Sequence, residues 1–219
     1  MRMLEEKLQK HIDLLVSRYS ALESIKDDII TAYFLIEESY KNGGKLMIAG
    51  NGGSAADAEH IAGELMKSFK LRRPVSDDFA EKLRSVDPVR GEALAKNLEC
   101  GLPAIALTTH EALSTAYMND SDALGVFAQQ LFGFGRKEDV FLGITTSGNS
   151  ENVVKAAVVA KAMGIKVVGL TGAKGGKIAD LSDVTIKVPE TETYMVQELH
   201  LPVYHCLCLM LEDRFFGAD

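Results

Sequence analysis

The chain has 219 residues, of which 47% are hydrophobic and 25% charged, a composition typical of one globular domain with a substantial core. Its net charge of −7 argues against a protein that binds the phosphate backbone of nucleic acids, although a local basic patch would survive an acidic total.

Three cysteines, Cys100, Cys206 and Cys208, lack the spacing of a disulfide framework, and two of them fall in an apolar run. We expect buried free thiols and a reducing, cytoplasmic setting. The opening residues mix acids with apolar residues, unlike a signal peptide, and no apolar run approaches the ~18 residues of a membrane span. We therefore expect neither a membrane nor a nucleic acid as a partner.

Residues 3–41 are predicted to be helical. Apolar residues recur at helical spacing from Leu4 to Leu15 and again from Ile25 to Ile36, and Asn42-Gly43-Gly44 ends the pattern. Because this amphipathic stretch precedes the first strand, we expect residues 1–42 to form an oligomerisation segment that packs on a partner subunit.

Strands and helices then alternate along the chain. The apolar runs predict strands at residues 45–50, 103–108, 140–145, 166–172 and 184–188. Helical periodicity predicts helices at residues 53–69, 110–117, 122–133, 151–163, 175–182 and 192–216. Short apolar strands separated by helices favour a three-layer α/β sandwich, a five-stranded parallel sheet with helices on both faces. Its ligand crevice lies beyond the carboxyl ends of the strands, where both Gly/Ser-rich turns of the chain fall.

Residues 70–100 interrupt this alternation with mixed charge and two of the five prolines. We predict an insertion that contains one or two short helices. Two roles remain open for it: a solvated surface insertion, or a lid or interface element over the site.

The first candidate motif is GNGGSAADAEHIAGE, from Gly50 to Glu64. Its glycines allow positive φ and close backbone approach, and Ser54 lies at a helix N-terminus, which favours anions. The motif is neither a dinucleotide fingerprint nor a Walker loop. His60 and Glu64 lie on one helix face, about 6 Å apart. The pair could bind a metal, act as an acid/base couple, or form a structural hydrogen bond.

The second motif is GITTSGNSENV, from Gly143 to Val153, which ends a strand and opens a helix. Hydroxyl groups and backbone N–H groups at a helix N-terminus can form a phosphate cradle without any Lys or Arg. The alternative is a polar capping loop, but the hydroxyl groups are more numerous than one cap requires. They belong to Thr145, Thr146, Ser147 and Ser150.

The third motif lies in the apolar closing helix. Gln197 and His205 share a face but stand about 12 Å apart along the axis. One metal could bind both only if their side chains converge or if Pro202 makes the helix irregular. His200 lies off that face and is predicted to be structural.

These three motifs, in this order, resemble the sugar isomerase (SIS) domain family, and within it the bacterial phosphoheptose isomerases. The resemblance spans nearly the whole chain, residues 1–219, as a single SIS domain, apart from the insertion at 70–100. It implies a flavodoxin-like sandwich, a homotetramer with active sites at subunit interfaces, and a zinc ion. The chain departs from the family pattern at Thr145, where serine is usual, and over Glu190–Tyr194, which matches only loosely.

Carried over position by position, the resemblance implies that the metal ligands are His60, Glu64, Gln197 and His205. It implies that the substrate-binding residues are Asn51, Gly52, Gly53, Ser54, Asn119, Asp120, Thr145, Thr146, Ser147, Ser150 and Gln197.

The expected reaction is aldose–ketose isomerisation of sedoheptulose 7-phosphate to D-glycero-D-manno-heptose 7-phosphate through an enediol. Glu64 is the expected base and His205 the expected acid. Three alternatives stay open: a non-catalytic relative that binds a protein partner, a regulatory domain that senses a sugar phosphate, and an enzyme for a different sugar phosphate. Keeping both catalytic side chains and the full ligand set favours an enzyme.

Overall fold

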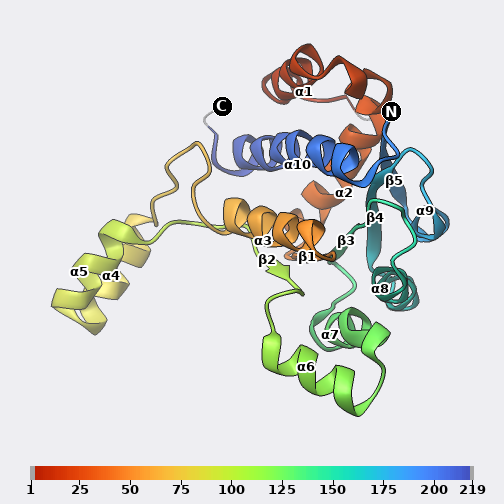
Figure 1. Cartoon of the computed structure of the whole chain (residues 1–219). Helices are drawn as coiled ribbons and strands as arrows, with labels where there is room; N and C mark the ends of the chain where they lie inside the picture. Colours follow the sequence, from red (N-terminus) through yellow and green to blue (C-terminus); the bar gives the residue numbers. More distant parts are fainter. Residues whose placement is uncertain (1–2, 218–219) are drawn as a thin grey trace.

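The predicted strands form one parallel sheet, in the order β2-β1-β3-β4-β5. Figure 1 shows this sheet in the computed structural model of the chain, which describes residues 3–217. The strands are β1 (Leu46–Ala49), β2 (Ala104–Ala106), β3 (Val140–Ile144), β4 (Lys166–Gly172) and β5 (Val184–Val188). The predicted α/β class is confirmed.

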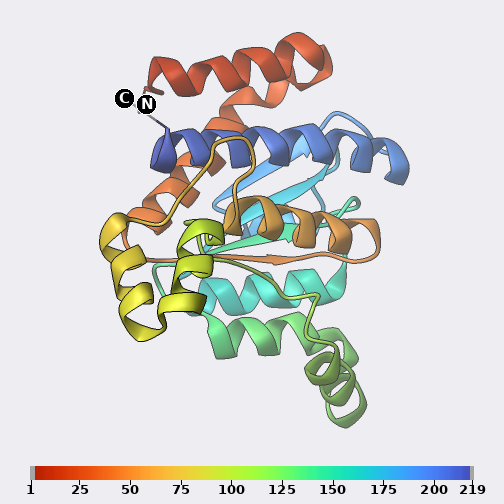
Figure 2. The same cartoon turned by 90° about the vertical axis from the view of Figure 1, so that its left-hand side faces the viewer.

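Helices cover both faces of the sheet, which is why β1 and β3 are buried at every position. One face is covered by α2 (Lys26–Lys41), α3 (Gly53–Met66) and α10 (Thr193–Phe216), and α1 (Glu6–Arg18) packs on the outside of α10. The other face is covered by α7 (Val126–Phe134) and α8 (Glu151–Ala162), with the short α9 (Lys177–Leu181) beside them. Figure 2 shows the two layers, with α6 (Glu111–Asp120) beyond α7.

The N-terminal segment is helical, as predicted for residues 3–41, but it is divided into two long helices. The chain turns at Tyr19 (φ −133°, ψ 73°), and the 3-10 helix η1 (Ser20–Ile25) joins α1 to α2. The two apolar stripes have different partners: α1 packs on α10, whereas α2 lies against β5 and the sheet. Leu8, Ile12 and Leu15 are buried by this packing within one chain. An oligomerisation role for residues 1–42 stays a prediction.

The segment predicted to be an insertion contains two short helices, α4 (Asp77–Val86) and α5 (Pro88–Asn97), within the predicted number, and they pack together as a hairpin. Figure 1 shows it standing away from the sheet. The two helices, all of whose residues the structure describes, bury Ala80 and Gly91. At its base, Pro74 and Glu99 form an antiparallel bridge.

A buried ion pair fixes this base to the domain. Arg73 and Glu212 are both buried, and Nε of Arg73 donates to Oε1 of Glu212 at 2.9 Å. The same guanidinium donates to the backbone carbonyl groups of Glu64 (3.1 Å) and Leu65 (2.8 Å). Arg73 therefore satisfies carbonyl groups at the C-terminal end of α3.

The closing helix α10 runs unbroken through Pro202. The irregularity that would let Gln197 and His205 converge is therefore not present in the helix. Cys206 and Cys208 are buried free thiols, as predicted, and burial raises the pKa of Cys206 to about 12. His200 is fully buried, in agreement with a structural role.

Candidate functional site

The turn between β1 and α3 is shaped by close contacts that exclude side chains. At Gly50 an added Cβ would lie 2.5 Å from the carbonyl oxygen of Ser54. At Gly53 it would collide with Nε2 of Gln197, so the end of that side chain lies directly against the turn. Gly52 has φ 55°, which suits glycine. These contacts explain the glycine run that the sequence shows.

The hydroxyl loop, residues 145–150, connects β3 to α8. Oγ1 of Thr145 and Oγ of Ser150 lie 2.9 Å apart, and Thr145 is buried beneath the loop. Ser150 occupies the N-cap position of α8, but within residues 3–217 its hydroxyl makes no capping hydrogen bond. N–H groups in the first helical turn of α8 therefore remain able to bind an external anion.

The two turns meet at the carboxyl edge of the sheet, where the neighbouring strands β1 and β3 end. The side-chain amides of Asn51 and Asn152 donate to each other, at 2.9 and 2.8 Å. A cavity of about 260 Å³ opens beside this pair, and its lining includes Gly52, Thr108, Ser114 and Met118. The predicted crevice thus has polar side chains at the two turns and an apolar lining that includes Val126 and Phe127.

A third turn, between β4 and α9, also belongs to this edge, although it is not one of the three predicted motifs. Gly148 in the hydroxyl loop has φ 71°, and an added Cβ there would collide with the carbonyl oxygen of Gly175. The backbone N–H of Lys177 donates to Oδ1 of Asn149 at 3.0 Å. The GAKGGK stretch, rich in glycine and lysine after a strand, was the available signal.

His60 and Glu64 form the predicted pair near the C-terminal end of α3. Nε2 of His60 lies 3.0 Å from Oε1 of Glu64, and Nδ1 of His60 lies 3.1 Å from the hydroxyl of Tyr204. That hydroxyl also donates to Oδ1 of Asp57 at 3.2 Å. Oε2 of Glu64 accepts a hydrogen bond from Nζ of Lys67 at 3.1 Å. The sequence analysis did not single out Asp57 and Tyr204, although both lie within the motifs; Asp57 is three residues before His60, on the same helix face.

His205 joins this pair from α10. Its ring centroid lies 5.1 Å from that of His60 and 5.4 Å from that of Phe69. Nε2 of His205 is buried and has no hydrogen-bond partner among the residues that the structure describes. Burial lowers the pKa of His205, the ring of His60 adds to this effect, and Glu64 opposes it. An imidazole held neutral beside a carboxylate is suited to proton transfer.

Gln197 does not join them. It lies against Gly53 at the other end of α3, eight residues and about 12 Å of helix from His205. Within residues 3–217, no group of three or more His, Cys, Asp or Glu side chains is arranged to hold a metal ion. The four predicted ligands are thus split, with three near the end of α3 and one near its beginning.

Asn119 and Asp120 lie at the end of α6. Nδ2 of Asn119 donates to Oδ1 of Asp120 at 2.7 Å, and both residues are exposed. Ser114 and Met118 of the same helix line the cavity at Asn51. Helix α6 therefore borders the crevice through other side chains than those the sequence singled out.

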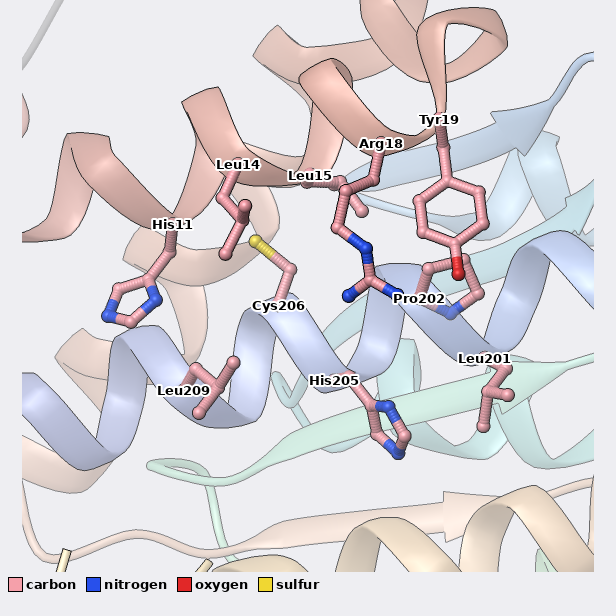
Figure 3. Close-up of a pocket in the computed structure, with 10 residues that line it drawn as sticks. All are labelled: His11, Leu14, Leu15, Arg18, Tyr19, Leu201, Pro202, His205, Cys206 and Leu209. Carbon is pink, nitrogen blue, oxygen red and sulfur yellow. The ribbon is translucent and has the colours of Figure 1, made fainter. Parts of the chain in front are cut away.

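A separate cavity of about 210 Å³ lies between α1 and α10. Figure 3 shows Arg18 of α1 and Tyr19 of the turn that follows it reaching toward α10, while the ring of His205 points away from α1. Most of its wall is apolar, with Leu14, Leu15 and others. His205 also lines this cavity, together with Leu201, Pro202, Cys206 and Leu209 of α10.

The fold and these turns define a class of protein: an α/β domain with a parallel five-stranded sheet and glycine- and hydroxyl-rich turns at its carboxyl edge. The family model described as SIS domain matches residues 11–99 and 89–172, and the chain belongs to this family. Its relatives include a phosphoheptose isomerase of Geotalea daltonii, 40% identical over 220 residues, which cover 98% of each chain. Another, from Aneurinibacillus thermoaerophilus, is 44% identical over 179 residues, covering 82% of this chain and 77% of the relative. Within the family, the chain is a member of the phosphoheptose isomerases.

Solved structures agree with this membership. The phosphoheptose isomerase of Neisseria gonorrhoeae has a TM-score of 0.72 at 32% identity, covering 96% of this chain and all of the other. That of Francisella tularensis has a TM-score of 0.74 at 28% identity, covering 95% and 97%. Among the described residues, no helix is long and apolar enough to span a membrane.

Proposed function

We propose that the protein interconverts sedoheptulose 7-phosphate and D-glycero-D-manno-heptose 7-phosphate, with Glu64 as base and His205 as acid. The observation that carries this proposal is the cluster of His60, Glu64 and His205 between α3 and α10. A carboxylate and a neutral imidazole, close together and partly buried, are the two groups that an enediol mechanism needs. The names of the full-length relatives supply the substrate class.

The proton transfers balance without a redox partner. Glu64 removes a proton from C1 of the ketose, and the electron pair forms the C1–C2 double bond while O2 gains a proton from His205. Glu64 then returns its proton to C2, and His205 takes the proton that leaves O1, which gives the aldehyde. His60 holds one carboxylate oxygen of Glu64 in place. The other oxygen is held by the exposed Lys67, a weak contact that substrate can displace.

A zinc ion is part of the proposal. His60, Glu64, His205 and Gln197 offer nitrogen and oxygen donors of the type zinc prefers, and Nε2 of His205 is unpartnered within residues 3–217. His60 and Glu64 would first have to give up their mutual hydrogen bond. When bound, zinc would polarise the substrate oxygens.

A homo-oligomer with shared active sites is also proposed, and the length of α3 supports it. Gly53, beside the hydroxyl loop, is about 16 Å along the helix from Glu64, at ~1.5 Å per residue. A seven-carbon sugar phosphate spans roughly 10 Å from C1 to phosphorus, given a C–C bond length of about 1.5 Å. A loop and Gln197 from one copy, facing Glu64 and His205 of another, would not be limited by this separation within one chain.

The test is an isomerase assay with sugar 7-, 6- and 5-phosphates, each with added zinc and with a chelator. We expect turnover of the heptose 7-phosphates above that of the shorter substrates, and a loss of activity with chelator. Preference for a 5- or 6-phosphate would overturn the substrate assignment. Full activity in the presence of chelator would overturn the proposal that the enzyme needs zinc.

A further inference from the structure

The hydroxyl loop, residues 145–150, contains no cationic side chain, although a phosphate monoester carries nearly two negative charges at pH 7. We propose that Lys177, from the turn between β4 and α9, supplies the missing charge to the substrate phosphate, and that Glu151 opposes it. This inference rests on the proposed function, because it assumes that residues 145–150 bind the phosphate.

The two turns are in direct contact. Gly148 leaves no room for a Cβ against the carbonyl oxygen of Gly175, and the Cα of Gly176 would lie 2.8 Å from that Cβ. The backbone of Lys177 is hydrogen-bonded to the side chain of Asn149. The Lys177 backbone is therefore held beside the loop, within reach of a phosphate through its flexible four-carbon side chain.

The ammonium group of Lys177 is close to the helix start where the phosphate would bind. Its Nζ lies 3.4 Å from Oε2 of Glu151, the first residue of α8. The side chains are 64% and 43% exposed, so this ion pair is weak and can reorganise when a ligand arrives. Glu151 places a negative charge beside Ser150, which a bound phosphate would feel as repulsion.

The pair predicts opposite effects from two conservative variants. Lys177→Gln should raise the KM for the sugar phosphate and the Ki for inorganic phosphate about three- to tenfold, with the larger effect at low salt. Glu151→Gln should lower both constants several-fold. Lys166→Gln is the matched control: it also removes one lysine charge, but Lys166 begins β4 at the opposite edge and pairs with Asp183 at 3.0 Å.

The measurement is the KM for substrate and the Ki for inorganic phosphate at two ionic strengths, with Ser147→Ala included as a loop variant. The inference is overturned if Lys177→Gln matches Lys166→Gln in both constants, or if Glu151→Gln weakens phosphate binding. A raised KM in Ser147→Ala with normal constants in Lys177→Gln would reject the inference and leave the loop assignment intact. Normal constants in both variants would remove the loop assignment, and the role of Lys177 with it.

Discussion

Glu64 is held by His60 through a 3.0 Å hydrogen bond across one turn of α3, and His205 of α10 stacks its ring edgewise on the same histidine. The carboxylate and the second imidazole are therefore brought together by a residue that touches both. This arrangement makes the protonation and orientation of the pair depend on the packing of two helices that are far apart in sequence.

The contact between Gly53 and Gln197 can be tested with an alanine. Gly53→Ala places a Cβ where Nε2 of Gln197 lies, so the amide must move away from the turn. We expect weaker substrate binding or lower turnover without loss of the fold, measured by steady-state kinetics and thermal unfolding.

Gly63→Ala is the control on the same helix, because an added Cβ there meets nothing within 4 Å among the described residues. It should stabilise the protein by about 0.5–1 kcal/mol through helix propensity. Equal kinetics for the two variants would contradict a role for Gln197 at the turn.

Breaking the buried ion pair between Arg73 and Glu212, at the base of the hairpin, should strongly destabilise the protein. Arg73→Met leaves the Glu212 carboxylate buried with its backbone donors, Phe69, Lys70 and Leu71, so we expect the free energy of unfolding to fall by about 3–5 kcal/mol. The double variant Arg73→Met/Glu212→Gln also removes the buried negative charge, so it should recover part of the lost stability. Urea unfolding measures both, and a single-variant cost below about 1 kcal/mol would contradict this prediction.

The buried His200 makes stability depend on pH. Burial lowers its pKa to about 4, with the backbone of Thr171 acting in the opposite direction. The unfolded chain, with a histidine pKa near 6.5, binds the proton more readily, so stability falls as the pH falls from about 6.5 toward 4.

Between pH 7 and pH 5, the titration of His200 should lower the free energy of unfolding by about 2 kcal/mol. His200→Gln, which cannot take up the proton, should lose that share of the pH dependence. The check is urea unfolding of both proteins at the two pH values, and identical pH dependence would count against the prediction.

Much of the fold could be predicted because strand and helix periodicities are local. The apolar runs around Leu46 and Val140 are buried on both faces, and this shows in composition alone. The break at Tyr19 could not be predicted, since both halves of residues 3–41 have helical spacing. The turn reflects two apolar stripes that pack on different elements, α10 and the sheet.

For the site, spacing predicted contacts within a helix, such as His60 with Glu64, because i and i+4 always share a face. Contacts between different helices and turns could not be predicted from spacing along the sequence. Tyr204 on His60, and Lys177 beside Asn149, depend on how α10 and the β4–α9 turn are positioned by the sheet.

Shared active sites predict complementation between inactive copies. Glu64→Gln and Ser147→Ala/Ser150→Ala damage the two halves of the site separately. If each site combines the loop of one subunit with the Glu64 of another, mixed oligomers made by co-expression should regain part of the activity that both parents lack. Activity of the mixture no higher than the average of the parents would argue that each chain carries its own site.

The most direct test of the central claim is the turnover of Glu64→Gln measured beside Glu59→Gln, the same change on the same helix outside the cluster. As the base, Glu64 should be needed for chemistry, so Glu64→Gln should lose about 10²–10⁴-fold in kcat while both variants unfold at the wild-type temperature. Near-normal turnover in a folded Glu64→Gln protein would contradict the account.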